Sequence, residues 1–478
     1  MWGIGVGMMK DYVQTDDKTG YCGGFIFVLV LGSFLLSSGV AIVSADGLSN
    51  HTALVPGYNG TNYTFLGSYS SGEVIINESG SYYLTDDLNS SPYEYGILIQ
   101  GTGITLDGNG KNLTGSSEIG IMGKEGSHHT TIINFSKISD FYYGMRLDGN
   151  NSLVNGNTVS DNGYTGIYVG GAYGTIVNNT AYLNSNGIYS TPHYGRNCVI
   201  MNNTAFLNKR MGIYTGGDSS LVYGNRAFRN NVYGIMAGGG DCGGIDPRDC
   251  GYGYYSNISG NVAYENGMYG IYSCEPSARV IGNTIYDNYQ AGIMIRSRLN
   301  NSVSDNLLTN NTIGIRTTYS NQYNVTMTGN IIRESVKAGI LVDGTYTKPG
   351  NFTIYNNILA NNQNIFMNDS TRCFTWNHPT GPVSGINVIG GPYLAGNYWS
   401  NPEGSGWSDL QDPKETGYSL VPYEVVDGSG SWDTAPLVRV AQIINASHDD
   451  WTILHPNGNQ SYPRYSNSNL HCPGKTGG

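Results

Sequence analysis

The chain has 478 residues, with 24 Lys and Arg against 35 Asp and Glu, which gives a formal net charge of −11 at pH 7. Charged residues make up only 12% of the chain, whereas glycine is abundant, with 69 residues. Glycine and the many asparagines are poor formers of helix interiors, so the composition excludes a mainly helical protein and favours a β protein with many turns. The acidic balance, without a basic patch, argues against nucleic acid as a partner.

The first feature along the chain is an apolar run over residues 23–45. Its small-residue ending, Val43-Ser44-Ala45, resembles a signal-peptidase site. At about 20 apolar residues, the run is also long enough to cross a bilayer as a retained anchor. Residues 1–45 are therefore predicted to be a signal peptide or a membrane anchor. In either case the rest of the chain is extracellular or displayed on the cell surface. Asn-x-Ser/Thr triplets, such as those at Asn178 and Asn202, agree weakly with export.

An internal repeat of about 22 residues follows. A Gly-Ile or Gly-Met pair recurs from Gly144 to Gly339, and an Asn usually stands nine residues before the Gly, as Asn203 stands before Gly212. A second Asn often follows five residues after the first, as Asn208 does. Three rows of apolar residues keep the same period, which implies three short strands per turn of chain, each facing one interior.

This pattern predicts a parallel β-helix, in which each coil pairs with the next at about 4.8 Å and equivalent residues stack in ladders. We expect the repeated Asn to adopt left-handed geometry at the corners, and its amide to bond to the coils above and below. We expect the repeat Gly to relax the following corner. A leucine-rich repeat shares the period, but it needs a Leu framework and a helical half-repeat that the sequence lacks.

The repeat defines the expected domain organisation. The β-helix is predicted over residues 96–392, preceded by a linker and N-terminal cap strands over residues 46–95. A cap is needed because a bare coil end is an unpaired sheet edge. Residues 393–437 are predicted to close the other end, with Trp399, Trp407 and Trp432 covering the last coil. Residues 438–478 are predicted to be an incomplete β segment and a frayed tail.

Three of the repeats carry a family resemblance. NTVSDNGYTGIYV, NTAYLNSNGIYS and NTIYDNYQAGIMI resemble the right-handed parallel β-helix repeats of the NosD-like family, also called the periplasmic copper-binding protein family. The segments SGSYYLTDDL and GNYWS resemble exported surface proteins of methanogenic archaea. The resemblance covers roughly residues 70–437 and implies an all-β, right-handed solenoid with caps. It implies little about chemistry, because sugar-binding proteins, hydrolases, lyases and accessory factors share this repeat.

An outward row of side chains is the first candidate site. Two residues after each repeat Gly, the side chain should point away from the interior, and four of these positions are tyrosines. Stacked tyrosines can contact sugar rings and hydrogen-bond at their edges. The alternative is that they only stack on one another and stabilise the parallel strands. With two arginines in the following coils, the candidate substrate-binding residues are Tyr168, Tyr189, Tyr214, Tyr272, Arg296 and Arg316.

An insertion between Gly234 and Gly270 is the second candidate site. It contains CGGIDPRDC, in which a local disulfide between Cys242 and Cys250 is expected, with Cys274 as a rival partner. A lyase or hydrolase could use Asp as acid or base and Arg to bind a uronate carboxylate. The alternative is a decorative loop pinned by the disulfide, since the motifs of polygalacturonase-like β-helices are absent. The loop candidates are Asp241, Asp246, Arg248 and Asp249.

No cofactor is predicted. Copper is suggested by the family name, but a copper site needs His, Met or Cys side chains that converge on one point, and the histidines are scattered. Met236 and Met294 lie two coils apart, which is too far for one ion. Calcium is also unsupported, because the stretch SDLQDPKETGY lacks a repeating Asp-Gly pattern.

The sequence therefore favours an exported cell-surface β-helix protein with a structural or carbohydrate-binding role, and it leans away from an enzyme. The expected partners are glycans or cell-envelope polymers. Two alternatives stay open. One is a polysaccharide lyase or hydrolase acting on the outward strand face, and the other is an accessory factor in copper-enzyme maturation. The sequence leaves the oligomeric state open.

Overall fold

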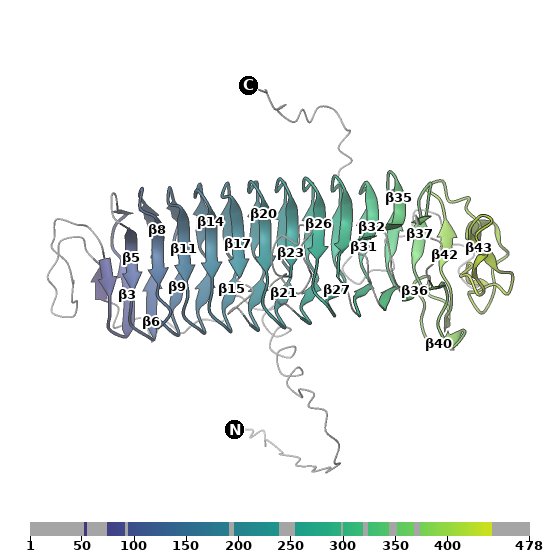
Figure 1. Ribbon diagram of the computed structural model, residues 1–478, viewed down its shortest axis with the longest axis horizontal. Coiled ribbons are helices and arrows are strands. Elements are labelled where there is room, and N and C mark those ends of the chain that lie inside the picture. The colour runs from purple at the N-terminus through teal and green to yellow at the C-terminus, as the bar shows by residue number, and fades with distance from the viewer. Residues whose placement is uncertain are drawn as a thin grey trace, which may run out of the picture. The chain divides into compact units, whose positions relative to one another are not determined.

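A computed structural model describes residues 52–54, 74–90, 94–190, 196–238, 254–297, 300–318, 324–343, 351–367 and 373–441. These residues belong to one compact unit that begins at Thr52. Their strands form three long parallel sheets, with 14 strands in sheet A and 13 each in sheets B and C, and each complete coil contributes one strand to every sheet (Figure 1). The prediction of an all-β parallel solenoid with three strands per coil is confirmed.

Neighbouring strands within each sheet come from successive coils. Sheet A contains β1 (Thr52–Leu54), β3 (Gly80–Leu84), β6 (Ile104–Asp107), β9 (Thr131–Ile133), β12 (Leu153–Asn155), β15 (Thr175–Val177), β18 (Val199–Met201), β21 (Leu221–Tyr223), β24 (Asn257–Ser259), β27 (Arg279–Ile281), β30 (Ser302–Ser304), β33 (Val325–Thr328), β36 (Asn351–Tyr355) and β39 (Cys373–Thr375).

Sheet B has the longest strands and follows sheet C within each coil. It contains β2 (Val74–Ile76), β5 (Tyr95–Ile99), β8 (Ile119–Gly123), β11 (Tyr143–Leu147), β14 (Thr165–Val169), β17 (Asn186–Ser190), β20 (Met211–Thr215), β23 (Tyr233–Ala237), β26 (Tyr269–Ser273), β29 (Ala291–Ile295), β32 (Ile313–Thr318), β35 (Ala338–Asp343) and β38 (Ile365–Met367).

Sheet C follows sheet A within each coil. It contains β4 (Leu88–Asn89), β7 (Asn112–Thr114), β10 (Lys137–Ser139), β13 (Thr158–Ser160), β16 (Thr180–Tyr182), β19 (Thr204–Phe206), β22 (Arg226–Phe228), β25 (Val262–Tyr264), β28 (Thr284–Tyr286), β31 (Leu307–Thr309), β34 (Ile331–Arg333), β37 (Ile358–Ala360) and β42 (Tyr398–Ser400). The C-terminal part adds two hairpins, β40 (Val383–Ser384) with β41 (Tyr393–Leu394) and β43 (Tyr423–Val426) with β44 (Ser431–Asp433), and the short 3₁₀ helix η2 (Ser408–Leu410).

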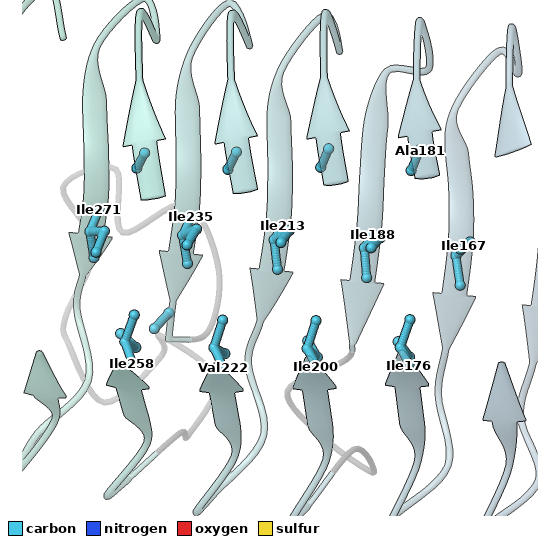
Figure 2. Close-up of a cluster of buried hydrophobic side chains, with 14 of the residues drawn as sticks. Ile167, Ile176, Ala181, Ile188, Ile200, Ile213, Val222, Ile235, Ile258 and Ile271 are labelled. Carbon is cyan, nitrogen blue, oxygen red and sulfur yellow. The ribbon is translucent and has the colours of Figure 1, made fainter. Parts of the chain in front are cut away.

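The interior of the solenoid is filled by one aliphatic row from each sheet. Figure 2 shows Ile176, Ile200 and Val222 of sheet A opposite Ile188 and Ile213 of sheet B, all with no exposed surface. Full burial of such a side chain contributes about 1.5–3 kcal/mol relative to exposure. Because each row is continuous along the axis, the hydrophobic core holds successive coils together.

Two asparagine ladders run along the inner corners. Asn203 is representative of the first ladder: its Nδ2 donates to Oδ1 of Asn225 in the next coil (3.0 Å) and to the carbonyl oxygen of Ile176 in the previous coil (2.8 Å). The second ladder repeats this pattern, as when Asn208 Nδ2 donates to Asn230 Oδ1 (2.9 Å). The predicted bonding of the Asn amides to the coils above and below is confirmed.

The expected left-handed geometry of these asparagines is wrong. In most coils positive φ belongs to the residue immediately before the ladder position, for example Asn202 (φ 55°) before Asn203 and Leu207 (φ 53°) before Asn208. The chain therefore turns the corner one residue earlier. This leaves the ladder Asn, which is buried, free to direct its amide along the row.

The expected role of the repeat glycines, to relax a corner, is wrong. These glycines allow neighbouring coils to pack closely. Gly212 is typical, because it does not have positive φ. A Cβ at Gly212 would lie 2.7 Å from Asn230 Nδ2 and 2.7 Å from the carbonyl oxygen of Gly234 in the next coil. A side chain at this position would therefore push neighbouring coils apart.

The parallel pairing extends beyond residues 96–392 at both ends. The strands β2, β3 and β4, expected as cap strands, pair in parallel with β5, β6 and β7. At the other end β42 continues sheet C beyond residue 392 by pairing in parallel with β37. Trp399 is 1% exposed and packs in the core, Trp407 packs against the core, and Trp432 is 46% exposed. Trp376, which no sequence pattern marked, is also buried at this end.

Several predictions fall on residues outside the described ranges. They concern the apolar run of residues 23–45, most of residues 438–478, and the insertion with Asp241, Asp246, Arg248, Asp249, Cys242 and Cys250. These stay predictions. Within the described ranges, no helix is both long enough and apolar enough to cross a membrane.

Candidate functional site on the outer face of sheet B

The predicted outward row lies in continuous register on sheet B. Tyr168 on β14 pairs with Tyr189 on β17, and Tyr189 pairs with Tyr214 on β20. The row continues through Met236, Tyr272, Met294, Arg316 and Leu341 on β23, β26, β29, β32 and β35. Of the six candidate residues only Arg296 lies off the row, because it directly follows the end of β29.

The tyrosines of this row stack on one another. The rings of Tyr168 and Tyr189 have centroids 5.7 Å apart with an interplanar angle of 7°, and Tyr189 and Tyr214 have centroids 4.2 Å apart. Tyr272, separated from them by Met236, stacks on Tyr233 at 5.1 Å. Because the inner ring faces contact each other, a ligand meets mainly ring edges and hydroxyl groups.

The row is also part of an apolar cluster outside the solenoid core. The buried members of this outer cluster are Met211, Tyr214, Met236, Tyr269, Tyr272, Ala291, Met294, Ile313, Ala338 and Leu341. Tyr214 is 1% exposed and Tyr272 is 4% exposed, whereas Tyr168 and Tyr189 are half-buried. Burial raises the pKa of Tyr189 and of Tyr272, so both hydroxyls stay protonated and able to donate.

A hollow of about 300 Å³ opens on this face. Strands β17, β20 and β23 supply its floor, and the residues directly before β14, β20 and β23 supply its rim. The residues that line the hollow are Tyr164, Tyr189, Arg210, Met211, Tyr214, Val232, Tyr233 and Met236. It therefore combines four phenol groups and one guanidinium with an apolar floor.

Sequence reasoning found Tyr189 and Tyr214 but missed Tyr164, Arg210 and Tyr233. These three precede the repeat Gly by one or two residues, where the expected three-row pattern assigned no outward position. A signal was available, because Tyr233 and Tyr269 both directly precede a repeat Gly. Outward side chains at the start of sheet B strands reach the same face as the row two residues after the Gly.

Three arginines flank the hollow along the same face. The guanidinium of Arg146 lies over the rings of Tyr143 (5.8 Å) and Tyr168 (5.2 Å) and pairs with Asp148 (3.0 Å). Burial raises the pKa of Asp148, and the positive charge of Arg146 opposes this increase. Burial also raises the pKa of Tyr143, to about 12. Arg316 pairs with Asp343 (2.7 Å).

The third of these arginines, Arg296, lies beside the hydroxyl of Tyr272, where its charge opposes the increase in pKa that burial causes. The candidate arginines of the sequence analysis, Arg296 and Arg316, therefore lie next to the outward row. The structure does not bring either of them into the lining of the hollow, where Arg210 is the charged residue.

A second aromatic row, on the outer face of sheet C, was not predicted. Tyr182, Phe206, Phe228, Tyr264 and Tyr286 stack with centroid spacings between 4.7 and 5.0 Å. Each ring comes three residues after an Asn of the first ladder, and this spacing was present in the sequence. The stacked faces make this row chiefly a structural ladder.

Comparisons with known proteins support the fold. Residues 244–404 match the family model of the periplasmic copper-binding protein NosD, and residues 119–250 match the model of the right-handed β-helix region. The predicted resemblance to the NosD-like family and the right-handed sense of the solenoid are confirmed. A comparison with curated proteins gives no match.

Solved structures with similar chains are parallel β-helix proteins. The Dettilon tailspike protein has a TM-score of 0.49 and 15% identity over 57% of this chain and 60% of its own. The A-module of the Azotobacter vinelandii mannuronan C-5 epimerase AlgE4 has a TM-score of 0.39 and 16% identity over 58% of this chain and 79% of its own.

The catalytic unit of an α-1,3-glucanase from Streptomyces thermodiastaticus has a TM-score of 0.42 and 14% identity over 63% of this chain and 62% of its own. The chain thus spans about three fifths of the tailspike. At these identities and TM-scores the similarity supports no conclusion about the function of this chain.

The described residues do not fit the copper in the family name. Within the described ranges, no group of three or more His, Cys, Asp or Glu side chains is placed to hold a metal ion. The thioethers of Met236 and Met294 come from strands two coils apart, β23 and β29, with β26 between them. We therefore derive no chemistry from copper in this part of the chain.

Proposed function

We propose that this chain is an exported cell-surface β-helix protein that binds carbohydrate in the hollow on the outer face of sheet B. The observation that carries the proposal is the composition of the hollow, with four tyrosines and Arg210 around an apolar floor. A sugar has apolar C–H groups and many hydroxyl groups. A sugar-binding site therefore needs both apolar surface and hydrogen-bonding groups.

The size of the hollow suits a short segment of a glycan. Its volume of about 300 Å³ lies at the lower end of the range for small-molecule sites. The flanking face of sheet B, with Arg146 on β11 and Arg316 on β32, extends along the solenoid axis on either side. A polymer can therefore place one unit in the hollow and lay its neighbours along the strands.

The charge of the hollow favours an acidic sugar. Arg210 is exposed at the rim, and it is the charged residue among the described lining residues. A guanidinium binds a carboxylate or sulfate through paired hydrogen bonds, which a neutral sugar cannot match. We therefore propose uronate-containing polymers as the first ligands to test.

Export is supported by the sequence, namely by the apolar run of residues 23–45 with its small-residue ending. In this proposal the solenoid displays the hollow to polymers outside the cytoplasm. N-terminal sequencing of the protein isolated from its native cells tests this part. A start at Asp46 supports a cleaved signal peptide, and an intact apolar run in a membrane fraction supports an anchor. An intact run in the soluble cytoplasmic fraction would contradict export.

The binding proposal is tested with the purified full chain on a glycan array, followed by calorimetric titration with the ligands retained. Tyr164→Ala and Arg210→Ala should each weaken binding at least about tenfold, as central anchors do in other interfaces. Tyr173→Ala is the matched control, because Tyr173 is 58% exposed and does not line the hollow.

Three outcomes would overturn the proposal. They are no glycan retained, equal binding by the Tyr164 and Arg210 variants and the wild type, or equal weakening by the Tyr173 control. Unsaturated or reducing-end products during incubation with uronate polymers would instead indicate a lyase or hydrolase.

A further inference from the structure

The corner between sheets C and B carries an unusual pair of leucines. In the middle coils, from β10 to β34, the residue directly after the sheet C strand turns the chain with positive φ. In six coils this corner residue is charged, namely Asp140, Asp161, Arg229, Glu265, Asp287 and Glu334. In two consecutive coils it is instead Leu183 (φ 57°) and Leu207 (φ 53°).

Leucine is unfavourable at this corner for two reasons. The left-handed region is strained for a residue with a Cβ, and Asp and Asn tolerate it better than Leu. The two leucines are also 43% and 45% exposed, and neither belongs to the solenoid core. The fold works with charged residues at the same corner in other coils, so it does not require leucine here.

Aromatic edges extend the exposed apolar surface. Tyr182 and Phe206, the half-buried rings directly before Leu183 and Leu207, stack on each other with centroids 4.9 Å apart. We define the leucine patch as these four residues, Tyr182, Leu183, Phe206 and Leu207. Contiguous exposed apolar surface rimmed by polar residues is typical of a protein contact.

Opposite charges border the leucine patch at equal distances along the axis. Asp161 occupies the corner one coil before Leu183, and Arg229 occupies the corner one coil after Leu207. Both side chains are accessible, at 37% and 58%. Asp161 also pairs with Lys137 (3.1 Å), and Arg229 pairs with Glu265 in the next coil.

We propose that the leucine patch joins two copies of this chain in an antiparallel dimer. The two-fold axis lies perpendicular to the solenoid and passes between Leu183 and Leu207. This symmetry sets Leu183 of one copy against Leu207 of the other, and Asp161 of one copy against Arg229 of the other. A parallel arrangement would instead set each charge beside its own equivalent, which repels.

The spacing of the patch also favours a second solenoid as its partner. The exposed edges repeat once per coil, at about 4.8 Å, and another copy of this chain repeats with the same period. A two-fold contact uses the same patch on both copies, so it closes after two subunits and does not propagate. The contact is independent of carbohydrate binding.

The first test is sedimentation velocity of the full chain over a concentration series. The wild type should dimerise, and Leu183→Asp with Leu207→Asp should raise the dimer dissociation constant at least about tenfold. At a concentration where both proteins are monomeric, the melting temperature of the double variant should not fall, because Asp occupies this corner in other coils. Leu420→Asp is the matched control, since Leu420 is 84% exposed in the C-terminal part and outside the patch. A monomer at all concentrations, or a dimer unchanged by the double variant, would overturn the proposal.

The second test exchanges the two charges. Asp161→Arg and Arg229→Asp should each weaken the dimer, and the two together should restore it, because the pair across the interface is rebuilt with reversed signs. The pairs with Lys137 and Glu265 within one chain are lost in the double variant, so restoration cannot come from them. A double variant that dimerises no better than either single variant excludes the antiparallel arrangement.

Discussion

Glu275 is a fully buried carboxyl group between β26 and β27, next to Gly238, where the insertion begins. Its Oε2 accepts a hydrogen bond from the backbone nitrogen of Ser256 (3.2 Å), and its Oε1 has no hydrogen-bond partner among the residues that the structure describes. Burial is the largest cause that raises the pKa of Glu275 from 4.5 to about 8. The side chain is therefore protonated at neutral pH in the folded protein.

This shift predicts a pH dependence of stability. Between pH 4.5 and about 8 the folded chain holds a proton on Glu275 that the unfolded chain has lost. The contribution of Glu275 to the free energy of unfolding is thus fully present below pH 4.5. It is lost as the pH rises to about 8, at up to ~1.4 kcal/mol per pH unit. Asp433, whose pKa burial raises from 3.8 to about 7, acts in the same direction.

Urea unfolding at pH 5, 7 and 9 checks this prediction. Glu275→Gln should flatten the pH dependence and should be more stable than the wild type at pH 9. Glu118→Gln, at an exposed position, is the control and should leave the slope unchanged. An unaltered slope in Glu275→Gln would show that the carboxyl group is not the source.

The asparagine ladders are the main polar elements of the fold, and the end of the first ladder explains a buried carboxyl group. Asn397 is the last Asn of the first ladder, and no further Asn follows it to accept from its backbone nitrogen. Asp433 takes this place: its Oδ2 accepts from Asn397 N (2.8 Å) and from Trp399 Nε1 (2.9 Å). The hairpin β43–β44 thus closes the ladder with a side chain from outside the repeat.

Removing an acceptor from either part of the ladder should destabilise the protein. Asn225→Ala leaves Asn203 N without its partner, and Asp433→Ala does the same to Asn397 N and Trp399 Nε1. Each buried unpaired donor costs about 1–3 kcal/mol. We therefore expect a lower free energy of unfolding for both variants, with Asp433→Asn less affected than Asp433→Ala.

Denaturant unfolding measures these differences, with Asn231→Ala as the control, because Asn231 is exposed and outside the ladder. Equal stability of Asn225→Ala and Asn231→Ala would contradict the role assigned to the ladder. Equal stability of the two Asp433 variants would mean that Asp433 does not act as the terminal acceptor.

At the scale of the whole molecule, the fold of the repeated coils could be predicted from the sequence. Ile200, Ala205 and Ile213 carry the period of the three interior rows, and all three are buried in the expected strands. The ends were harder to predict, because Trp376 and Asp433 act through contacts between segments far apart in the sequence. No local pattern marks such contacts.

The outer surface was only partly predictable for a related reason. The spacing from the repeat Gly gives the row of Tyr168, Tyr189 and Tyr214, but the hollow also needs Tyr164 and Arg210, which precede the strands. Which outward side chains enclose a hollow depends on how neighbouring coils align, and a one-dimensional period does not specify this alignment. The same limit applies to the exposure of Leu183 and Leu207.

A crystal structure of the full chain with an acidic oligosaccharide retained on the glycan array tests the proposed function most directly. We predict sugar density in the hollow, with a carboxylate or sulfate group at Arg210 and ring contacts to Tyr164 and Tyr189. Density for the sugar at another face of the solenoid, with the hollow free of sugar, would contradict the central claim.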